Sequence, residues 1–128
     1  MRFFVLILLL IVISTARSQQ ATPLPTGEKT SFQRPDELLK KAKLAQDASP
    51  IRSIEWANKA LKLSQEIDDK NVIAQAHLLL GKLTRRIQQN ENSQQHFLTA
   101  STLFEKLGDT KKHILSYTYY INSLLEDR

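Results

Sequence analysis

Hydrophobic residues recur at steps of three and four from Pro35 onward, the spacing that gives a helix one apolar face. The stripes predict five helices, which cover about residues 35–46, 50–68, 70–88, 91–107 and 110–125. Because the links between them are only about two to four residues long, consecutive helices must pack antiparallel. The pattern therefore predicts an all-α fold of stacked helical hairpins.

Turn residues mark the expected ends of these helices. Ser49 precedes Pro50 as an N-cap precedes a first-turn proline. Asn90 is expected to cap the fourth helix and Asp109 the fifth, and Gly108 is expected to end the fourth helix at a C′ position. A further glycine, Gly81, falls inside the third helix, where it costs about 1 kcal/mol and so predicts close packing of a neighbour.

The part of the chain that precedes Pro35 differs from this helical part. Met1-Arg2 and the apolar run Phe3–Ile13 are typical of an export signal, and Ala16 and Ser18 fit the −3 and −1 positions of a cut after Ser18. This apolar run is shorter than the roughly 20 residues that a helix needs to cross a bilayer, although a retained anchor stays open. We expect a signal peptide over 1–18, a flexible linker over 19–34 and a helical domain over 35–128, in an exported protein that is periplasmic or secreted.

Composition narrows the function further. Without Cys the chain has no disulfide, thiolate metal site or thiol nucleophile. Removal of the signal lowers the net charge from 18 − 13 = +5 to 16 − 13 = +3, because Arg2 and Arg17 leave with it. A mildly basic mature chain gives little compositional support to nucleic-acid binding.

Catalytic patterns are absent from the sequence. The three histidines are widely separated along the chain, and none has metal-ligand spacing; we expect His77 at a seam between helices and His96 and His113 exposed. The three glycines are isolated, so no phosphate-binding loop is predicted. The pair Asp68-Asp69 lies at a helix boundary, where capping explains it. The sequence predicts no enzyme, no cofactor and no metal.

An internal repeat gives the strongest indication of architecture. The turn Ile67–Lys70 recurs as Leu107–Thr110, and the arithmetic of the two turns, 109 − 69 = 40, sets the period. The preceding helices keep the same register, since Ala60 corresponds to Ala100 and Leu63 to Leu103. A period of two helices is the mark of an α-solenoid.

These residues resemble a known family. Leu80-Gly81, then Phe97, Ala100 and Leu103, and then Leu107-Gly108-Asp109 are similar to the tetratricopeptide repeat in its longer, roughly 40-residue variety, over about 35–128. His77, Thr84 and Ser93 depart from the family pattern, which usually has a large aromatic residue, Tyr and Ala there. The resemblance implies a short right-handed α-solenoid of about five helices.

The resemblance also implies a partner site. In such arrays the first helix of each hairpin lines a concave groove that holds an extended peptide or a partner helix. By register the groove residues are Gln75, Leu78, Lys82 and Arg85 from the third helix and Thr118, Tyr119 and Asn122 from the fifth. Lys82, Arg85 and Arg86 form a basic patch that suits an acidic partner, and a solvated helix face explains the same charges.

The fifth predicted helix carries more apolar residues than one covering face needs. Its stripe of Ile114, Tyr117, Ile121 and Leu124 is expected to cover the fourth helix. Leu115, Tyr120 and Leu125 would then stay exposed as an interface, together with Tyr119, for self-association or another protein.

The sequence thus favours an exported scaffold that binds a protein or peptide, without nucleic acid and with membrane contact only through an uncleaved signal. One alternative is the N-terminal sensory or regulatory segment of a bacterial signalling system, because the stretch resembles exported repeat segments of such proteins. Another is a helical ligand-binding protein or enzyme with an unrecognised pocket.

Overall fold

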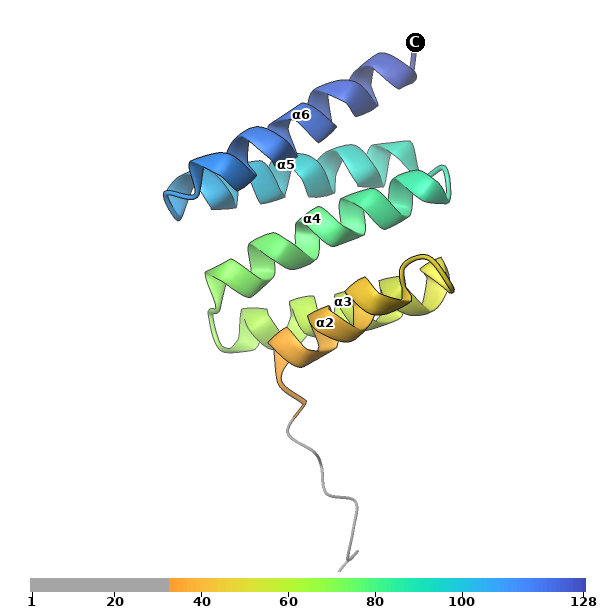
Figure 1. Cartoon of the computed structure of the whole chain (residues 1–128). Coiled ribbons are helices and arrows are strands. Elements are labelled where there is room, and N and C mark those ends of the chain that lie inside the picture. Colours follow the sequence, from red (N-terminus) through yellow and green to blue (C-terminus); the bar gives the residue numbers. More distant parts are fainter. Residues whose placement is uncertain (1–32) are drawn as a thin grey trace, which may run out of the picture. The chain divides into compact units, whose positions relative to one another are not determined.

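Five α-helices make up residues 33–128, the part of the chain that the computed structural model describes (Figure 1). They are α2 (Pro35–Ala45), α3 (Pro50–Glu66), α4 (Lys70–Arg86), α5 (Asn90–Lys106) and α6 (Thr110–Glu126). No strand occurs among these residues, so the predicted all-α fold is confirmed. The predicted signal peptide and all of the predicted linker except Gln33 and Arg34 lie outside the described residues.

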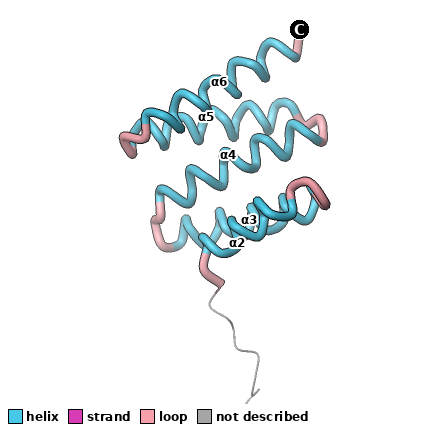
Figure 2. Tube along the Cα trace, viewed as in Figure 1, coloured by secondary structure: helices cyan, strands magenta, loops and turns pink. Residues whose placement is uncertain are grey.

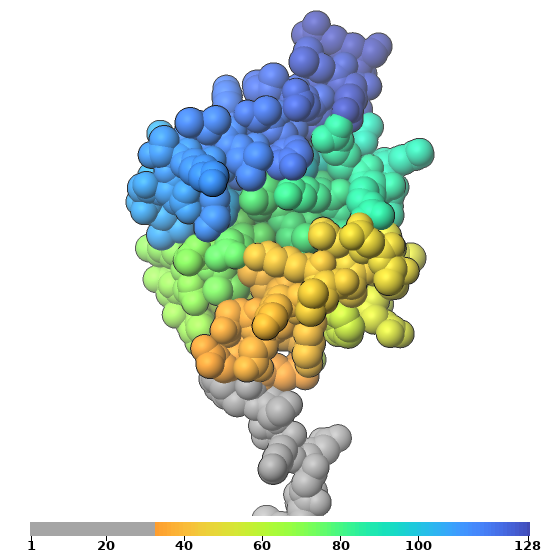
Figure 3. All heavy atoms as spheres, in the orientation of Figure 1, coloured from red at the N-terminus to blue at the C-terminus, as the bar shows by residue number. Residues whose placement is uncertain are grey.

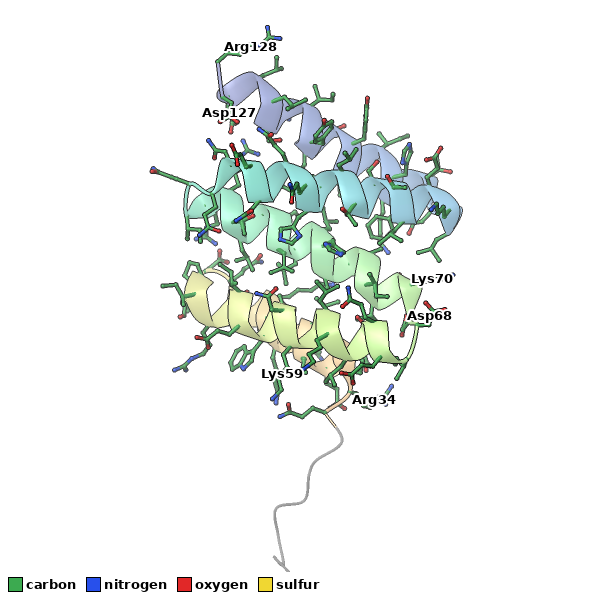
Figure 4. The ribbon with its side chains drawn as sticks, turned by 180° about the vertical axis from the view of Figure 1, so that it is seen from behind. Arg34, Lys59, Asp68, Lys70, Asp127 and Arg128 are labelled. Carbon is green, nitrogen blue, oxygen red and sulfur yellow. The ribbon has the colours of Figure 1, made fainter. Side chains whose placement is uncertain are left out.

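The helices form a stack of antiparallel hairpins. Each helix packs against the helices before and after it, and α2 also touches α4. In Figure 1, α2, α4 and α6 lie on the near side, with α3 and α5 behind them, and the reverse view in Figure 4 brings α3 and α5 to the front. Alternate helices therefore share a face, as the two-helix repeat predicts.

The last three links, which Figure 2 draws as short loops, have the same backbone conformation. Their middle residues have left-handed backbones, at Asp68 (φ 53°), Gln88 (φ 63°) and Gly108 (φ 73°). The next amide in each turn donates to a carbonyl in the last turn of the preceding helix: Asp69 to Ser64, Gln89 to Thr84 and Asp109 to Phe104, each at 2.9 Å. This pattern is a Schellman motif, which satisfies carbonyls that a helix end leaves unpaired. The turn recurs at a constant spacing, since 88 − 68 and 108 − 88 are equal.

The residue that ends each turn also begins the next helix. The Asp69 carboxylate accepts the Val72 amide at 3.1 Å, and the Asp109 carboxylate accepts the Lys112 amide at 3.0 Å. Asp109 is thus the predicted cap of the last helix. Asn90 is not a cap, because the N-cap of α5 is Gln89 and Asn90 is already helical. The repeated turn fixes this boundary, whatever the local cap preference.

Close packing along the hairpins is allowed by small residues. A Cβ on Gly81 would lie 2.6 Å from Cδ1 of the buried Phe97 ring, which confirms the close neighbour predicted at this glycine. The main apolar cluster joins α2, α3 and α4; its buried members are Leu38, Leu39, Ala42, Ala57, Ala60, Val72, Ala76, Leu79, Leu80 and Leu83.

Two buried serines make the same contact in successive repeats. The Ser53 hydroxyl donates to the Ala42 carbonyl at 2.6 Å, and the Ser93 hydroxyl donates to the Gly81 carbonyl at 3.0 Å. Each bond ties the start of the second helix of a hairpin to the backbone of the first. Ser93, a departure from the family pattern, therefore satisfies its buried hydroxyl within the fold.

Candidate peptide-binding groove

A groove runs across the face shared by α2, α4 and α6. It consists of two adjoining hollows of about 510 and 270 Å³, which have Gln46 and Lys82 in common. The space-filling view shows α4 between α2 and α6 on this face (Figure 3). The helical period places one stripe of α4 along the whole groove, formed by Gln75, Leu78, Leu79, Lys82, Arg85 and Arg86.

The smaller hollow brings together three lysines from three helices. Lys43 comes from α2, Lys82 from α4 and Lys112 from α6, around the apolar side chains of Leu78, Leu79 and Leu115. Burial lowers the pKa of Lys43, and the positive charges of Lys112 and Lys82 lower it further. The three ammonium groups therefore act on one another in a partly desolvated space.

Few carboxylates offset this charge. Lys112 pairs with Asp109 at 3.2 Å, whereas neither Lys43 nor Lys82 belongs to an ion pair among the described residues. Lys43 Nζ donates to Gln75 Oε1 at 2.9 Å, and Lys82 Nζ lies 5.0 Å from the centre of the Tyr119 ring. A carboxylate placed here would gain two cations that have no acidic partner.

Two arginine contacts link the walls of the larger hollow. Arg85 Nε donates to Glu126 Oε2 at 2.9 Å, which links α4 to α6. Arg86 donates to the Gln46 carbonyl at 2.8 Å and pairs with Asp47 at 3.1 Å, which links α4 to the end of α2. The arginines thus have acidic partners on neighbouring segments, whereas Lys43 and Lys82 have none among the described residues.

Neither a family model, nor a curated protein, nor a solved structure matches the chain.

Most of the groove residues expected from the sequence line these hollows. Gln75, Leu78, Lys82, Arg85, Arg86 and Tyr119 do so. Thr118 and Asn122 are exposed on α6 and line neither hollow. Leu115, expected in an interface of the last helix, lies in the wall of the smaller hollow.

Sequence reasoning missed Lys43, Gln46 and Lys112. Lys43 and Gln46 belong to the short first helix and the turn after it, where no groove was assigned. Lys112 shares a face with Leu115 and Tyr119 at steps of three and four, which is a signal the sequence carried. The groove is formed by α2, α4 and α6 together, so the sequence of any one helix does not show which lysines lie close to one another.

His96 and His113 are more buried than the sequence predicts, whereas His77 lies where it was expected. Nδ1 of His77 and Nδ1 of His96 are 3.0 Å apart in the seam between α4 and α5. His77 is therefore at a helix seam, as expected, but His96 is half-buried against it rather than exposed. His113 is also half-buried, with Nδ1 3.0 Å from the Ser101 carbonyl. Each ring fills space between antiparallel neighbours.

The face by which α6 packs on α5 was predicted wrongly. Ser116 and Ser123 are its buried residues, whereas Ile114, Tyr117, Ile121 and Leu124 are exposed. Tyr119 and Tyr120 are half-buried rather than exposed, and the Tyr119 ring stacks on Phe97 at 5.2 Å. Ser116 and Ser123 take the register of Ala76 and Leu83 in α4, one repeat earlier, so the repeat rather than the apolar stripe decides the packing face.

The described residues contain neither a cluster of metal ligands nor a membrane-spanning helix. Over 33–128, no group of three or more His, Cys, Asp or Glu side chains is placed to hold a metal ion. In the same range, no helix has the length and apolar character needed to span a membrane.

Proposed function

We propose that the chain is an exported helical-repeat scaffold, similar to tetratricopeptide arrays, that binds an extended acidic peptide in the groove across α2, α4 and α6. The observation that carries the proposal is the meeting of Lys43, Lys82 and Lys112 around an apolar floor. The three positive charges come from separate helices, and Lys112 already has Asp109 as an acidic partner. Lys43 and Lys82 repel each other until an anion neutralises them. Carboxylates on a peptide would supply that neutralisation.

The apolar floor favours a peptide over a free anion. Leu78, Leu79 and Leu115 line the same hollow as the lysines, so a ligand with alternating acidic and apolar side chains contacts both. With about 10 Å between packed helices, the groove across three helices is about 20 Å long, which about six extended residues cover. The groove thus suits a short segment of another protein.

Selection from a library of random short peptides tests this proposal. We expect the peptides retained by residues 19–128 to be enriched in Asp or Glu next to Leu, Ile or Phe. A retained peptide labelled with fluorescein should bind about tenfold more weakly to the Lys43→Gln/Lys82→Gln variant in fluorescence anisotropy, which is about 1.4 kcal/mol.

The matched control is Lys59→Gln/Lys62→Gln, which removes two exposed charges from α3. Lys59 lies on the opposite side of the stack from the groove (Figure 4). This variant should bind as the wild type does. Equal weakening by both double variants, or selection without acidic residues, would contradict the proposed groove.

A further inference from the structure

The outer face of α6 corresponds to a face of α4 that is covered. By the internal repeat, Ile114, Tyr117, Ile121 and Leu124 occupy the positions of Ala74, His77, Gly81 and Thr84. On α4 this face meets α5: Ala74 clusters with Phe104, His77 contacts His96, and Gly81 lies under Phe97. The register therefore makes the outer face of α6 a helix-packing surface.

That surface is apolar and uncovered in the described residues. Its large side chains are Ile114, Tyr117, Ile121, Leu124 and Leu125, with Ile114 58% and Leu125 57% exposed. Polar serines face α5 instead. Because α6 buries serines and exposes large apolar side chains, a second surface that covers those apolar side chains would stabilise it.

The spacing along this face is the same in both directions. Ile114, Thr118, Ile121 and Leu125 follow at steps of four, three and four, close to the average of about 3.5 residues that keeps a seam facing a partner helix. An antiparallel pair of such helices sets Ile114 opposite Leu125 of the partner subunit. It also brings the two central residues, Thr118 and Ile121, close to the two-fold axis. The face therefore fits a second copy of itself.

The helix dipole of α6 favours the antiparallel arrangement. Most charges at the ends of α6 are engaged within the chain, because Lys112 pairs with Asp109 and Glu126 pairs with Arg85. Antiparallel pairing opposes the two helix dipoles and separates the exposed Lys111 side chains of the two copies. Parallel pairing would set like ends together.

We propose that two copies of the chain dock antiparallel through the outer faces of α6 to form a symmetric dimer. A helix of the length of α6, 17 residues, is about 25 Å long. A strip of that length buries about 400 Å² on each copy, which is less than a stable interface buries. We therefore expect the dimer to be in exchange with the monomer. This interface is separate from the groove, so either proposal can fail without the other.

Sedimentation equilibrium of residues 19–128 tests the dimer, since the described helices supply their own core. From about 5 µM to about 1 mM, we expect the mass to rise from one chain to two, with dissociation in the tens of micromolar. Ile121→Glu/Leu125→Glu should remain monomeric at about 1 mM and keep its helical circular dichroism. Leu44→Glu is the matched control, because Leu44 is 77% exposed but lies on α2.

Three results would overturn the proposal. The first is a wild-type monomer at about 1 mM, and the second is a dimer that survives the double substitution. The third is a mass that grows beyond two chains and falls with Leu44→Glu, since that would show head-to-tail stacking of α6 on the other end of the array.

Single cysteines then test the orientation, because the chain has no cysteine of its own. In an antiparallel pair, Thr118→Cys forms a disulfide with its own copy near the two-fold axis. Ile114→Cys alone does not, yet it is joined to Leu125→Cys when the two variants are mixed. Self-linkage at all three positions without the mixed product would show parallel pairing and overturn the antiparallel interface.

Discussion

At the scale of single residues, the seam between α4 and α5 holds a histidine, His77, whose pKa is lowered by its surroundings. His77 and His96 approach through Nδ1 atoms 3.0 Å apart, with ring centres 5.2 Å apart. One ring donates its Nδ1–H and the other accepts, so the bond needs at least one neutral ring. Burial lowers the pKa of His77 to about 4, and the neighbouring His96 contributes to this. Burial also lowers the pKa of His96.

The lowered pKa predicts that mild acid destabilises the fold. Well above pH 6.5 His77 is neutral whether folded or unfolded, so it contributes no pH dependence there. As the pH falls from 6.5 toward 4, the unfolded chain takes up a proton that the folded chain does not, and stability falls. The loss is about 3 kcal/mol for a fully shielded ring and about 2 kcal/mol for one that is partly exposed.

Urea unfolding at several pH values measures this loss. We expect His77→Gln to lose about 1 kcal/mol less stability than the wild type between pH 7 and pH 5, before most carboxylates titrate. His113→Gln is the control, because it removes a half-buried histidine from the α5–α6 seam instead. Identical pH dependence in His77→Gln and the wild type would show that the seam does not hold His77 neutral.

At the scale of elements, three chemically different pairs make the same turn. Asp68-Asp69, Gln88-Gln89 and Gly108-Asp109 adopt nearly the same backbone. Gln88 takes a left-handed conformation that glycine adopts more easily, and Gln89 is an N-cap without a side-chain hydrogen bond. The turn between α4 and α5 is therefore the least favourable of the three locally.

Transplanting the better pair should stabilise the protein. Gln88→Gly/Gln89→Asp gives this turn the residues of the α5–α6 turn, and we expect about 1 to 2 kcal/mol of added stability in urea unfolding. The reverse change, Gly108→Gln/Asp109→Gln, should lose a similar amount. A decrease with the first variant would mean that the two turns are not equivalent.

The contrast between these turns shows what local sequence can predict. Gly108 and Asp109 gave the end of one helix and the cap of the next, whereas Gln88 and Gln89 carry no local signal and the cap was placed one residue late, at Asn90. Helix periods are local, and so all five helices follow from apolar spacing. The partners of His96 and the buried face of α6 depend on contacts between helices, and spacing within one helix does not determine them.

At the scale of the whole described stack, each helix depends mainly on its neighbours along the chain. The central helix α4 has eight buried residues, including Leu79, Leu80 and Leu83, whereas α6 has only Ser116 and Ser123. In such a nearest-neighbour array, stability is a sum of local terms, and an end helix with one neighbour opens first. The end that opens most easily is also the one proposed to pair with a second copy.

Amide hydrogen exchange measures both the local opening of α6 and its pairing with a second copy. At about 5 µM, where we expect a monomer, the amides of α6 should exchange at least about tenfold faster than those of α4, because α6 has two buried residues and α4 has eight. At about 1 mM, pairing should slow exchange in α6 while α4 changes little, since only the bound end helix gains a neighbour.

The Ile121→Glu/Leu125→Glu variant should show fast exchange in α6 at both concentrations. Protection of α6 equal to that of α4 at low concentration would contradict the nearest-neighbour picture, because it would mean that the last helix is held by the whole stack rather than by α5.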